Sequence, residues 1–338
     1  MTTRETMKAV RLHRFGGPEV LVVDEVPVPR PEAGEVLVRV HAVGLNPPDW
    51  YAREGMPDVP ETLKPPMHLP LIPGTDVSGE VVAVGDDVAT FTPGDQVFGL
   101  LRFPSVLQSG AYAEYVTAPA VYLALKPAGV DHAHAAALAM SGLTAWQFLV
   151  EVGHDHPSPF QAAQHVPMTL GAGSTVLVNG AAGGVGHLAV QLARWRGAEV
   201  VAVASGGHER FLGELGVERF IDYTRQQPQE AVRGVDLVLD AVGGSRSRRF
   251  LQCVRRGGAL YPVYFGEFDN EENAELGVTV TATQVRASGV QLARLAGLVA
   301  DGDLRAAIDS TYPLEAARSA HERAARGHIQ GKIVLTVG

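Results

Sequence analysis

Residues 174–196 read STVLVNGAAGGVGHLAVQLARWR. The valine-rich apolar run that ends at Asn179 predicts a strand buried on both faces. Glycines follow at once, and apolar residues then recur at the spacing of one helix face. Strand, glycine turn and helix in this order form the first unit of a dinucleotide-binding fold. In such a unit the turn lets the backbone approach a pyrophosphate, and the helix N-terminus offers free N–H groups to that anion.

The glycine spacing differs from the strict dinucleotide motif. Gly180, Gly183 and Gly186 stand three residues apart, with Gly184 directly after Gly183. The strict motif is GxGxxG, in which the first two glycines are two residues apart. For the glycines taken alone, a strand-to-helix turn without a ligand remains the alternative.

Apolar runs alternate with helical stretches after this unit. Helices are expected at 208–215 and 245–255, and further strands at 199–204, 219–223, 235–242, 259–263 and 277–282. Alternation at this spacing predicts an α/β domain with a doubly wound parallel sheet.

The first 135 residues have another pattern, in which short β-branched or apolar runs are separated by Gly/Pro turns. These runs lie at 20–28, 35–43, 79–84, 96–100 and 113–117. They predict a closed or nearly closed β-barrel. The segment 57–73 contains six prolines and is expected to be a surface loop, whereas 131–152 is alanine-rich and predicts a helix.

The last fifty residues leave the strand–helix rhythm. Helices are expected at 291–299 and 316–326, and a closing strand at 332–337. We expect these elements to return to the first domain. The nucleotide domain, 139–286, would then be an insertion between 1–138 and 287–338.

Composition excludes several classes of protein. The chain has 338 residues, a net charge of −9 and one cysteine, Cys253. Such a charge, with no basic stripe, argues against nucleic acid as a partner. A single cysteine excludes an intramolecular disulfide and suits a cytoplasmic protein. No stretch has the length and apolarity of a membrane span, and the first ten residues lack the apolar region of a signal peptide.

The insertion 153–173 contains His154, His156 and His165. Neither a cysteine nor a pair of carboxylates lies nearby in the sequence to complete a metal site. We therefore interpret this segment as a plain loop.

Nine motifs in order along the chain resemble the zinc-independent branch of the medium-chain dehydrogenase/reductases, that is, the quinone oxidoreductase or zeta-crystallin-like proteins. The motifs are GLNPPDW (44–50), LPLIPGTDVSGEVVAVGDDV (69–88), GDQVFG (94–99), GAYAEYV (110–116), SGLTAW (141–146), NGAAGGVGHLAVQLA (179–193), IDY (221–223), DAVGG (240–244) and GKIVLTV (331–337). The resemblance implies a GroES-like first domain and a Rossmann second domain.

The zinc-dependent branch of this superfamily has a cysteine at the position of Asn46 and Gly-His-Glu at 74–76, where this chain has Gly-Thr-Asp. Asn46 and Thr75 cannot replace the lost ligands, and the cysteine-rich lobe is absent. We therefore expect no zinc and no other metal.

The resemblance also implies the reaction and its residues. The family transfers a hydride from a nicotinamide to a conjugated carbonyl or a quinone, and a hydrogen-bond donor near the carbonyl oxygen would lower the barrier. Asn46, Asp49 and Tyr51 correspond to the loop that faces the nicotinamide in relatives. We expect Asn46 to orient substrate or nicotinamide, Tyr51 to be a donor and Asp49 to fix the loop. Loop hydrogen bonding without substrate contact is the alternative for all three.

The cofactor residues come from the same comparison. Thr144 corresponds to a position that contacts the nicotinamide ribose or carboxamide. The pyrophosphate turn, the ends of the fourth and fifth strands and the GKIVL motif add Gly180, Gly183, Gly184, Val185, Val242, Tyr264, Phe265 and Lys332. For Thr144 the alternative is a threonine inside a helix that bonds its own backbone. Rim packing is the alternative for the two aromatic residues, and a surface lysine whose stem lies on apolar neighbours is the alternative for Lys332.

The end of the second strand bears on the choice of cofactor. NAD sites place an acid there to bind the ribose 2′-hydroxyl, whereas this chain has Ser205 and His208. Tyr223 corresponds to a family position that lines a 2′-phosphate, which favours NADPH over NADH. The cation usual in relatives is missing, and only His208 or the shifted Arg210 could replace it.

These residues together predict an NADPH-dependent reductase of a quinone, enone or enal. The alternatives are an enoyl reductase of a biosynthetic pathway and a non-catalytic NADPH-binding protein. The resemblance also implies a homodimer, for which 277–282 is the candidate edge strand.

Overall fold

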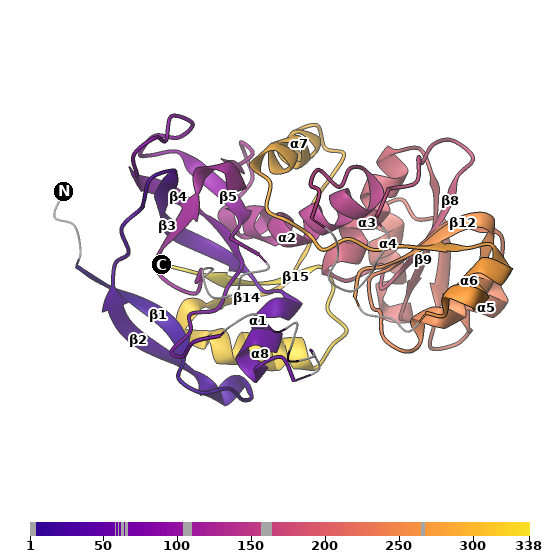
Figure 1. The fold of residues 1–338 in the computed structure, drawn as a ribbon, viewed down its shortest axis with the longest axis horizontal. Helices are drawn as coiled ribbons and strands as arrows, with labels where there is room; N and C mark the ends of the chain where they lie inside the picture. Colours follow the sequence, from indigo (N-terminus) through magenta and orange to yellow (C-terminus); the bar gives the residue numbers. More distant parts are fainter. Residues whose placement is uncertain are drawn as a thin grey trace. The chain divides into compact units, whose positions relative to one another are not determined.

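The computed structural model describes residues 5–57, 59, 61, 64, 67–103, 110–156, 164–264 and 268–338. The chain forms two compact units, one of Met1–Leu143 with Val285–Gly338 and one of Thr144–Gln284. In Figure 1 the first unit therefore has both the indigo and the yellow ends of the colour scale. The long helix α2 (His132–Leu149) carries the chain from the first unit into the second.

The first unit is built on a seven-stranded, mostly antiparallel sheet in the order β14-β15-β3-β4-β5-β7, with β6 also paired to β3. Its strands are β3 (Glu35–Gly44), β4 (Asp76–Val84), β5 (Gln96–Leu100), β6 (Tyr115–Pro119), β7 (Leu123–Leu125), β14 (Ile308–Pro313) and β15 (Lys332–Thr336). A separate hairpin pairs β1 (Thr6–Leu12) with β2 (Leu21–Pro27). The C-terminal strand β15 pairs antiparallel with β3, so the tail of the chain lies in this sheet.

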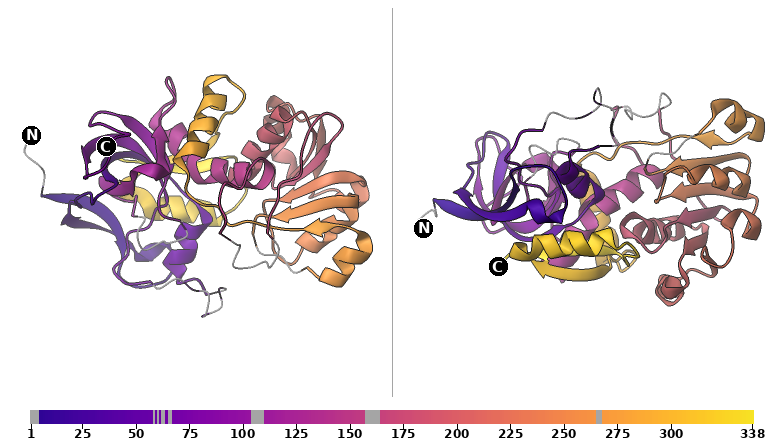
Figure 2. Two further views of the ribbon diagram at one scale, coloured as in Figure 1. Left: turned by 45° about the horizontal axis from the view of Figure 1, so that its top comes forward. Right: turned by 90° about the horizontal axis from the view of Figure 1, so that it is seen from below.

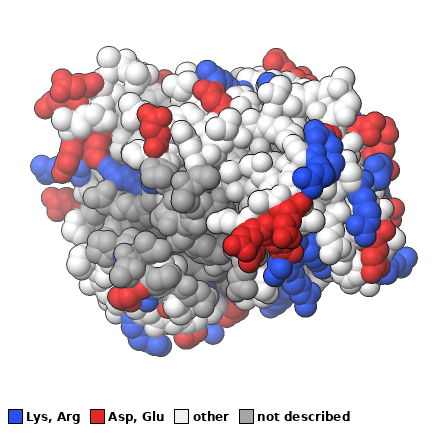
Figure 3. All heavy atoms as spheres, turned by 45° about the vertical axis from the view of Figure 1, so that its right-hand side comes forward, with Lys and Arg blue, Asp and Glu red and all other residues white. Residues whose placement is uncertain are grey.

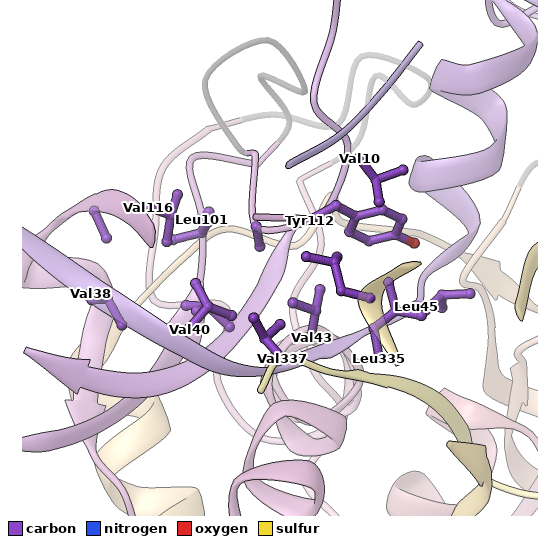
Figure 4. Close-up of a cluster of buried hydrophobic side chains, with 14 of the residues drawn as sticks. Val10, Val38, Val40, Val43, Leu45, Leu101, Tyr112, Val116, Leu335 and Val337 are labelled. Atoms are coloured by element: carbon purple, nitrogen blue, oxygen red, sulfur yellow. The ribbon is translucent and has the colours of Figure 1, made fainter. Parts of the chain in front are cut away.

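Helices and short 3-10 turns complete the first unit. They are η1 (Pro18–Val20), α1 (Pro47–Glu54), η4 (Ala120–Tyr122), α7 (Gly289–Ala300), η7 (Leu314–Ala316) and α8 (Ala317–Ala325). The core between these elements is dominated by valine and leucine, and Val38, Val43 and Leu335 are less than 1% exposed. Figure 4 shows this cluster with the ring of Tyr112 among the aliphatic side chains.

The second unit is a six-stranded parallel sheet in the order β10-β9-β8-β11-β12-β13. Its strands are β8 (Thr175–Asn179), β9 (Glu199–Ala204), β10 (Arg219–Asp222), β11 (Val235–Asp240), β12 (Val254–Pro262) and β13 (Thr279–Val280). The strand order reverses between β8 and β11, and in such sheets this reversal marks the ligand-binding end. The predicted doubly wound parallel sheet is confirmed.

Helices connect the strands of this sheet (Figure 2), and α3 (Gly184–Trp195) packs against β8 and β9. The remaining helices are η5 (Gly206–His208), α4 (Glu209–Glu214), α5 (Pro228–Ala231), η6 (Ser247–Cys253) and α6 (Asn270–Leu276). Cys253, at the end of η6, is buried and free.

The sequence predictions differ from the structure at several elements. The expected strand 277–282 is only the two residues of β13, because Gly277 adopts a left-handed conformation (φ 65°) that ends α6 there. The expected helix at 245–255 is the 3-10 helix η6, and β12 starts earlier than predicted, at Val254. The polar helix α6, capped by Asp269, was not predicted, because no apolar periodicity marks it.

Candidate functional site

The glycine turn after β8 is closely packed on one side. A Cβ on Gly186 would lie 2.1 Å from the carbonyl oxygen of Gly180, so only glycine fits there. Gly180 itself has a positive φ of 72°. Gly183 is the N-cap of α3 and has no side chain to occupy the first N–H groups of that helix. The turn therefore offers backbone N–H groups to an anion, as a pyrophosphate site requires.

Two polar residues fix this turn to the neighbouring strand. Asn179 ends β8 and Asp240 ends β11, and the register pairs the two residues. Asn179 Nδ2 donates to Asp240 Oδ1 at 2.7 Å. Asp240 is fully buried and also accepts from the N–H groups of Val242 (3.0 Å) and Gly243 (3.1 Å) and from the Ser247 hydroxyl. Asp240 thus holds the loop after β11 against the glycine turn.

Sequence reasoning did not assign this role to Asn179 or Asp240. The signal was available, because each residue is the polar end of an apolar parallel strand. The ends of parallel neighbours meet at one edge of the sheet. Val242, which was predicted as a cofactor residue, lies 58% exposed at this edge, and its side chain is the nearest atom to a Cβ placed on Gly180 (2.7 Å).

The turn after β9 contains the residues predicted for the adenosine end of the cofactor. Ser205 is the N-cap of η5, and His208 ends η5. Tyr223 lies beside this turn, because its N–H donates to the carbonyl of Ala204 at 3.2 Å, and its side chain is 40% exposed. The structure thus brings Ser205, His208 and Tyr223 to one edge of the sheet.

Arg210 does not join them. Its side chain is 92% exposed, and its Nε pairs with Glu214 Oε1 at 3.0 Å, one turn further along α4. The guanidinium is therefore directed along its own helix.

The other predicted cofactor residues fall in three places. Thr144 is buried in α2, and Tyr264 is half-buried just after β12. Phe265 lies outside the described residues. Lys332 belongs to the first unit, where it is only 3% exposed.

In the first unit, Lys332 is the centre of a buried polar cluster at one end of β15, β3 and β4. Its Nζ donates to the carbonyl of Leu45 (2.6 Å) and to Asn46 Oδ1, and it lies 3.4 Å from Asp76 Oδ2. Three oxygen partners match the three hydrogens of a charged ammonium. Burial lowers the pKa of Lys332 and raises the pKa of Asp76, while the opposite charge of each partner counters both shifts. The alternative of a surface lysine is therefore wrong.

Asn46 is 2% exposed, and its amide is directed into this cluster. Its Oδ1 accepts from Lys332, and its Nδ2 donates to the carbonyl of Gly44 and to Thr75 Oγ1, each at 3.2 Å. Both N–H hydrogens of the amide are thereby used. Asn46 thus orders the loop that begins α1, and it has no hydrogen left to donate to a substrate oxygen.

Asp49 closes a capping box with Asn46 at the start of α1. The Asn46 N–H donates to Asp49 Oδ2 at 2.8 Å. Burial raises the pKa of Asp49 to about 7, and the backbone N–H of Asn46 works against that rise. Asp49 therefore fixes the loop in this structure.

A second chain of hydrogen bonds starts beside Asp49 with Tyr112, whose ring belongs to the apolar cluster of Figure 4. The Tyr112 hydroxyl lies 3.0 Å from His321 Nε2, and His321 Nδ1 lies 2.8 Å from Arg53 Nη1. A guanidinium only donates, so His321 accepts at Nδ1 and donates from Nε2 to Tyr112. Burial and the charge of Arg53 lower the pKa of His321 to about 3, which keeps the ring neutral.

Tyr51 differs from its neighbours in this loop because it is half-buried rather than buried. Its ring meets the edge of Trp50, with ring centroids 6.1 Å apart. Of the three residues predicted to be catalytic, Tyr51 is the one whose side chain reaches the surface of the first unit.

The described part of the chain contains no group of three or more His, Cys, Asp or Glu side chains placed to hold a metal ion. His165 of the insertion is buried, and its ring nitrogens lie 2.9 Å from Thr281 Oγ1 and 3.1 Å from the Phe148 carbonyl. On the face drawn in Figure 3, the basic and acidic side chains of the described residues are interspersed. Among the described helices, none is long and apolar enough to cross a membrane.

Comparison with known proteins gives two family matches. Residues 32–128 match the family described as alcohol dehydrogenase GroES-like domain, and residues 215–335 match the family described as zinc-binding dehydrogenase.

Similar proteins cover almost the whole chain. A chloroplast envelope quinone oxidoreductase homolog of Arabidopsis thaliana is 32% identical over 97% of this chain and 98% of its own length. The human quinone oxidoreductase is 31% identical over 99% of both chains. Among solved structures, the quinone oxidoreductase from Coxiella burnetii is 33% identical, covers 98% of this chain and 100% of its own, and superposes with a TM-score of 0.84.

Proposed function

The chain belongs to the quinone oxidoreductase family of the medium-chain dehydrogenase/reductases, and from this premise we propose that it is an NADPH-dependent reductase of quinones or α,β-unsaturated carbonyl compounds that works without zinc. The observation that carries the proposal is the pair of turns at the ends of β8 and β9. The first turn presents backbone N–H groups at the uncapped start of α3. The second has Ser205 where an NAD site has an acid.

The residues of the second unit fit a dinucleotide. The glycine turn is suited to a pyrophosphate, since the N-cap of α3 makes no side-chain hydrogen bond to the N–H groups of the helix start. Asp240 and Asn179 hold that turn and the loop of Val242 in a fixed relation. A nicotinamide cofactor bound there supplies the hydride. Fixed backbone groups lower the entropy that is lost when cofactor and acceptor are aligned.

The cluster around Lys332 supports a reaction without zinc. The ammonium already balances the buried carboxylate of Asp76, and the Asn46 amide is committed to internal bonds. A dication placed beside Lys332 would meet a like charge in a buried site. We therefore propose that Lys332 and Asn46 are positioning residues, and that Tyr51 is the residue of this loop that contacts the acceptor.

We also propose a homodimer, formed where β13 is the edge of the parallel sheet. The Thr281 N–H donates to the Leu260 carbonyl of β12 at 3.3 Å, so the N–H of the preceding residue, Val280, faces the outer edge. Val280→Pro removes that donor without removing a bond to β12. We expect the variant to be a monomer by light scattering. The control Val290→Ala, on α7 of the first unit, should remain dimeric.

A cytoplasmic location, predicted from the single cysteine, is part of the proposal.

The experiment that tests the function follows NADPH oxidation at 340 nm with a panel of quinones, enals, enones and acyl thioesters. We expect turnover with at least one quinone or free enone, and slower turnover with acyl thioesters. Turnover confined to acyl thioesters would indicate the enoyl reductase. Tight NADPH binding with no acceptor-dependent oxidation would indicate the non-catalytic binding protein.

A further inference from the structure

The turn after β10 is joined to the turn after β9 by Asp222. The register pairs Asp222 with Ala204, the last residue of β9. Asp222 Oδ2 would lie 2.6 Å from a Cβ on Gly206, so the carboxylate lies directly against the Ser205–Gly206 backbone. The same carboxylate oxygen lies 3.5 Å from Nε of Arg225. Arg225 therefore places a positive charge beside the turn after β9, where the cation usual in relatives is missing.

We propose that Arg225, held by Asp222, is the specificity-determining cation that binds the 2′-phosphate of NADPH. This inference rests on the proposed function, since it names the residue that would make the site at Ser205 select NADPH. Arg225 was not among the sequence predictions, because it stands 20 residues after Ser205. The sequence candidates for this cation, His208 and Arg210, lie only three and five residues after Ser205.

The backbone around Arg225 is fixed, although its side chain is free to turn. The Arg225 N–H donates to the Asp222 carbonyl at 3.0 Å, which closes a turn at the end of β10. The side chain is 86% exposed, and an exposed ion pair is weak. The guanidinium can therefore exchange its contact with Asp222 for a phosphate at little cost, and its fork matches two phosphate oxygens.

Asp222 ends β10 and uses Oδ1 within the turn that follows, whereas an NAD-site acid ends the second strand. Its Oδ1 accepts from the Thr224 N–H (3.0 Å) and the Thr224 hydroxyl (2.7 Å). Its Oδ2 lies against Gly206 and Arg225. Hydrogen bonds from Thr224 hold the pKa of Asp222 below its ordinary value. The carboxylate thus anchors the arginine beside the turn.

Arg210 offers a matched comparison. It is an arginine on the same edge of the sheet, as exposed as Arg225, and it pairs with Glu214 on its own helix. Arg225 instead pairs with a residue that touches the Ser205–Gly206 turn. Comparing a variant of each arginine therefore distinguishes a specific contact with the phosphate from a general effect of positive charge.

Isothermal titration with adenosine 2′,5′-bisphosphate and with 5′-AMP tests the proposal without catalysis. For the wild type we expect the bisphosphate to bind more tightly than 5′-AMP. Arg225→Gln should weaken bisphosphate binding by about tenfold, the size of one charge-assisted hydrogen bond, and leave 5′-AMP binding unchanged. Arg210→Gln should change neither.

The outcomes distinguish failure of the Arg225 assignment from failure of the proposed NADPH specificity. If the wild type prefers the bisphosphate and Arg225→Gln keeps that preference, the assignment of Arg225 is overturned while NADPH specificity stands. If Arg210→Gln loses the preference instead, the cation is Arg210. If the wild type binds both nucleotides equally, the NADPH proposal itself fails. Thermal unfolding of each variant, expected within about 2 °C of the wild type for exposed arginines, excludes loss of the fold as the cause.

Discussion

The polar cluster of the first unit and the nucleotide turns of the second unit differ in where their polar groups form hydrogen bonds. Around Lys332 the ammonium and the Asn46 amide are buried and bonded internally, and both hydrogens of the amide are used. At the glycine turn the backbone N–H groups at the start of α3 are left uncapped, and the side chains that follow β9 and β10 are largely exposed. A saturated buried cluster keeps a shape, whereas an open backbone edge is suited to receive a ligand.

This difference distinguishes residues that we expect to contact the nucleotide from residues that position other parts of the protein. Lys332 and Asn46 have charged or polar side chains, but these side chains form their hydrogen bonds inside the protein. The nucleotide turns consist largely of glycine, and their backbone N–H groups are left without a side-chain cap. Substitutions in the first cluster should therefore change stability first, and substitutions in the turns should change nucleotide binding first.

The largest expected effect is the removal of the buried ammonium. Lys332→Met leaves the fully buried carboxylate of Asp76 without its counter-charge. We expect a loss of about 3–5 kcal/mol in the free energy of unfolding, measured by urea denaturation. The double variant Lys332→Met/Asp76→Asn should recover part of that loss.

The matched control is a lysine in an exposed pair. Lys8 pairs with Glu315 at 3.0 Å, and both side chains are 52% exposed. Lys8→Met should cost less than about 1 kcal/mol. Equal costs for Lys332→Met and Lys8→Met would contradict the role given to the buried cluster.

The next effect concerns the closed side of the glycine turn. Gly186→Ala places a Cβ against the backbone of Gly180 and Ala181, which must move apart. We expect a loss of stability of about 1–3 kcal/mol together with loss of NADPH binding, measured by urea denaturation and by NADPH fluorescence. Gly207→Ala is the control for stability, because no heavy atom lies within 4 Å of its Cβ. A Gly186→Ala protein that binds NADPH like the wild type would refute the close packing of this turn.

A smaller and pH-dependent effect is expected at Asp49. The pKa of its carboxyl is about 7 in the fold, against an ordinary value of 3.8. Between these values the folded chain binds more protons than the unfolded chain, so this residue's contribution to stability is complete below about pH 4 and is lost as pH rises to about 7. Asp49→Asn removes the titration. Its stability relative to the wild type should therefore rise with pH, by at most about 1.4 kcal/mol per pH unit.

Urea denaturation of both proteins at intervals from pH 5 to pH 8 measures that difference. A difference that stays constant over this range would show that Asp49 is ionised throughout.

The smallest effect is expected at Arg210. Its exposed pair with Glu214 spans one helical turn, and such pairs contribute about 0.3–0.5 kcal/mol. Arg210→Gln should lower stability by no more than this, and its NADPH affinity should equal that of the wild type. A clear fall in NADPH affinity would move the phosphate site from the turn after β10 to α4.

The sequence predicted the parts of the fold that depend on local pattern. The strands β8, β9 and β11 are continuous apolar runs, and the glycines after β8 mark the turn directly. The helix α1 was missed because it begins with Pro47 and Pro48, which read as a loop although proline is well tolerated in the first turn of a helix.

The candidate site was less predictable because its bonds join distant parts of the chain. Lys332 and Asn46 are 286 positions apart, and only the pairing of β15 with β3 brings them together. The place of Arg225 depends on the register of β10 with β9. Motifs identified which residues matter in these cases, but whether a side chain faces a ligand or the protein interior is set by tertiary packing.

Coenzyme preference with one quinone acceptor is the most direct test of the central proposal. The measurement is kcat/KM for NADPH and for NADH at one fixed acceptor concentration, with wild type and Arg225→Gln side by side. We predict that the wild type prefers NADPH by about tenfold or more and that Arg225→Gln loses most of this preference through KM rather than kcat. Equal use of the two coenzymes by the wild type, or a preference for NADH, would contradict the proposal.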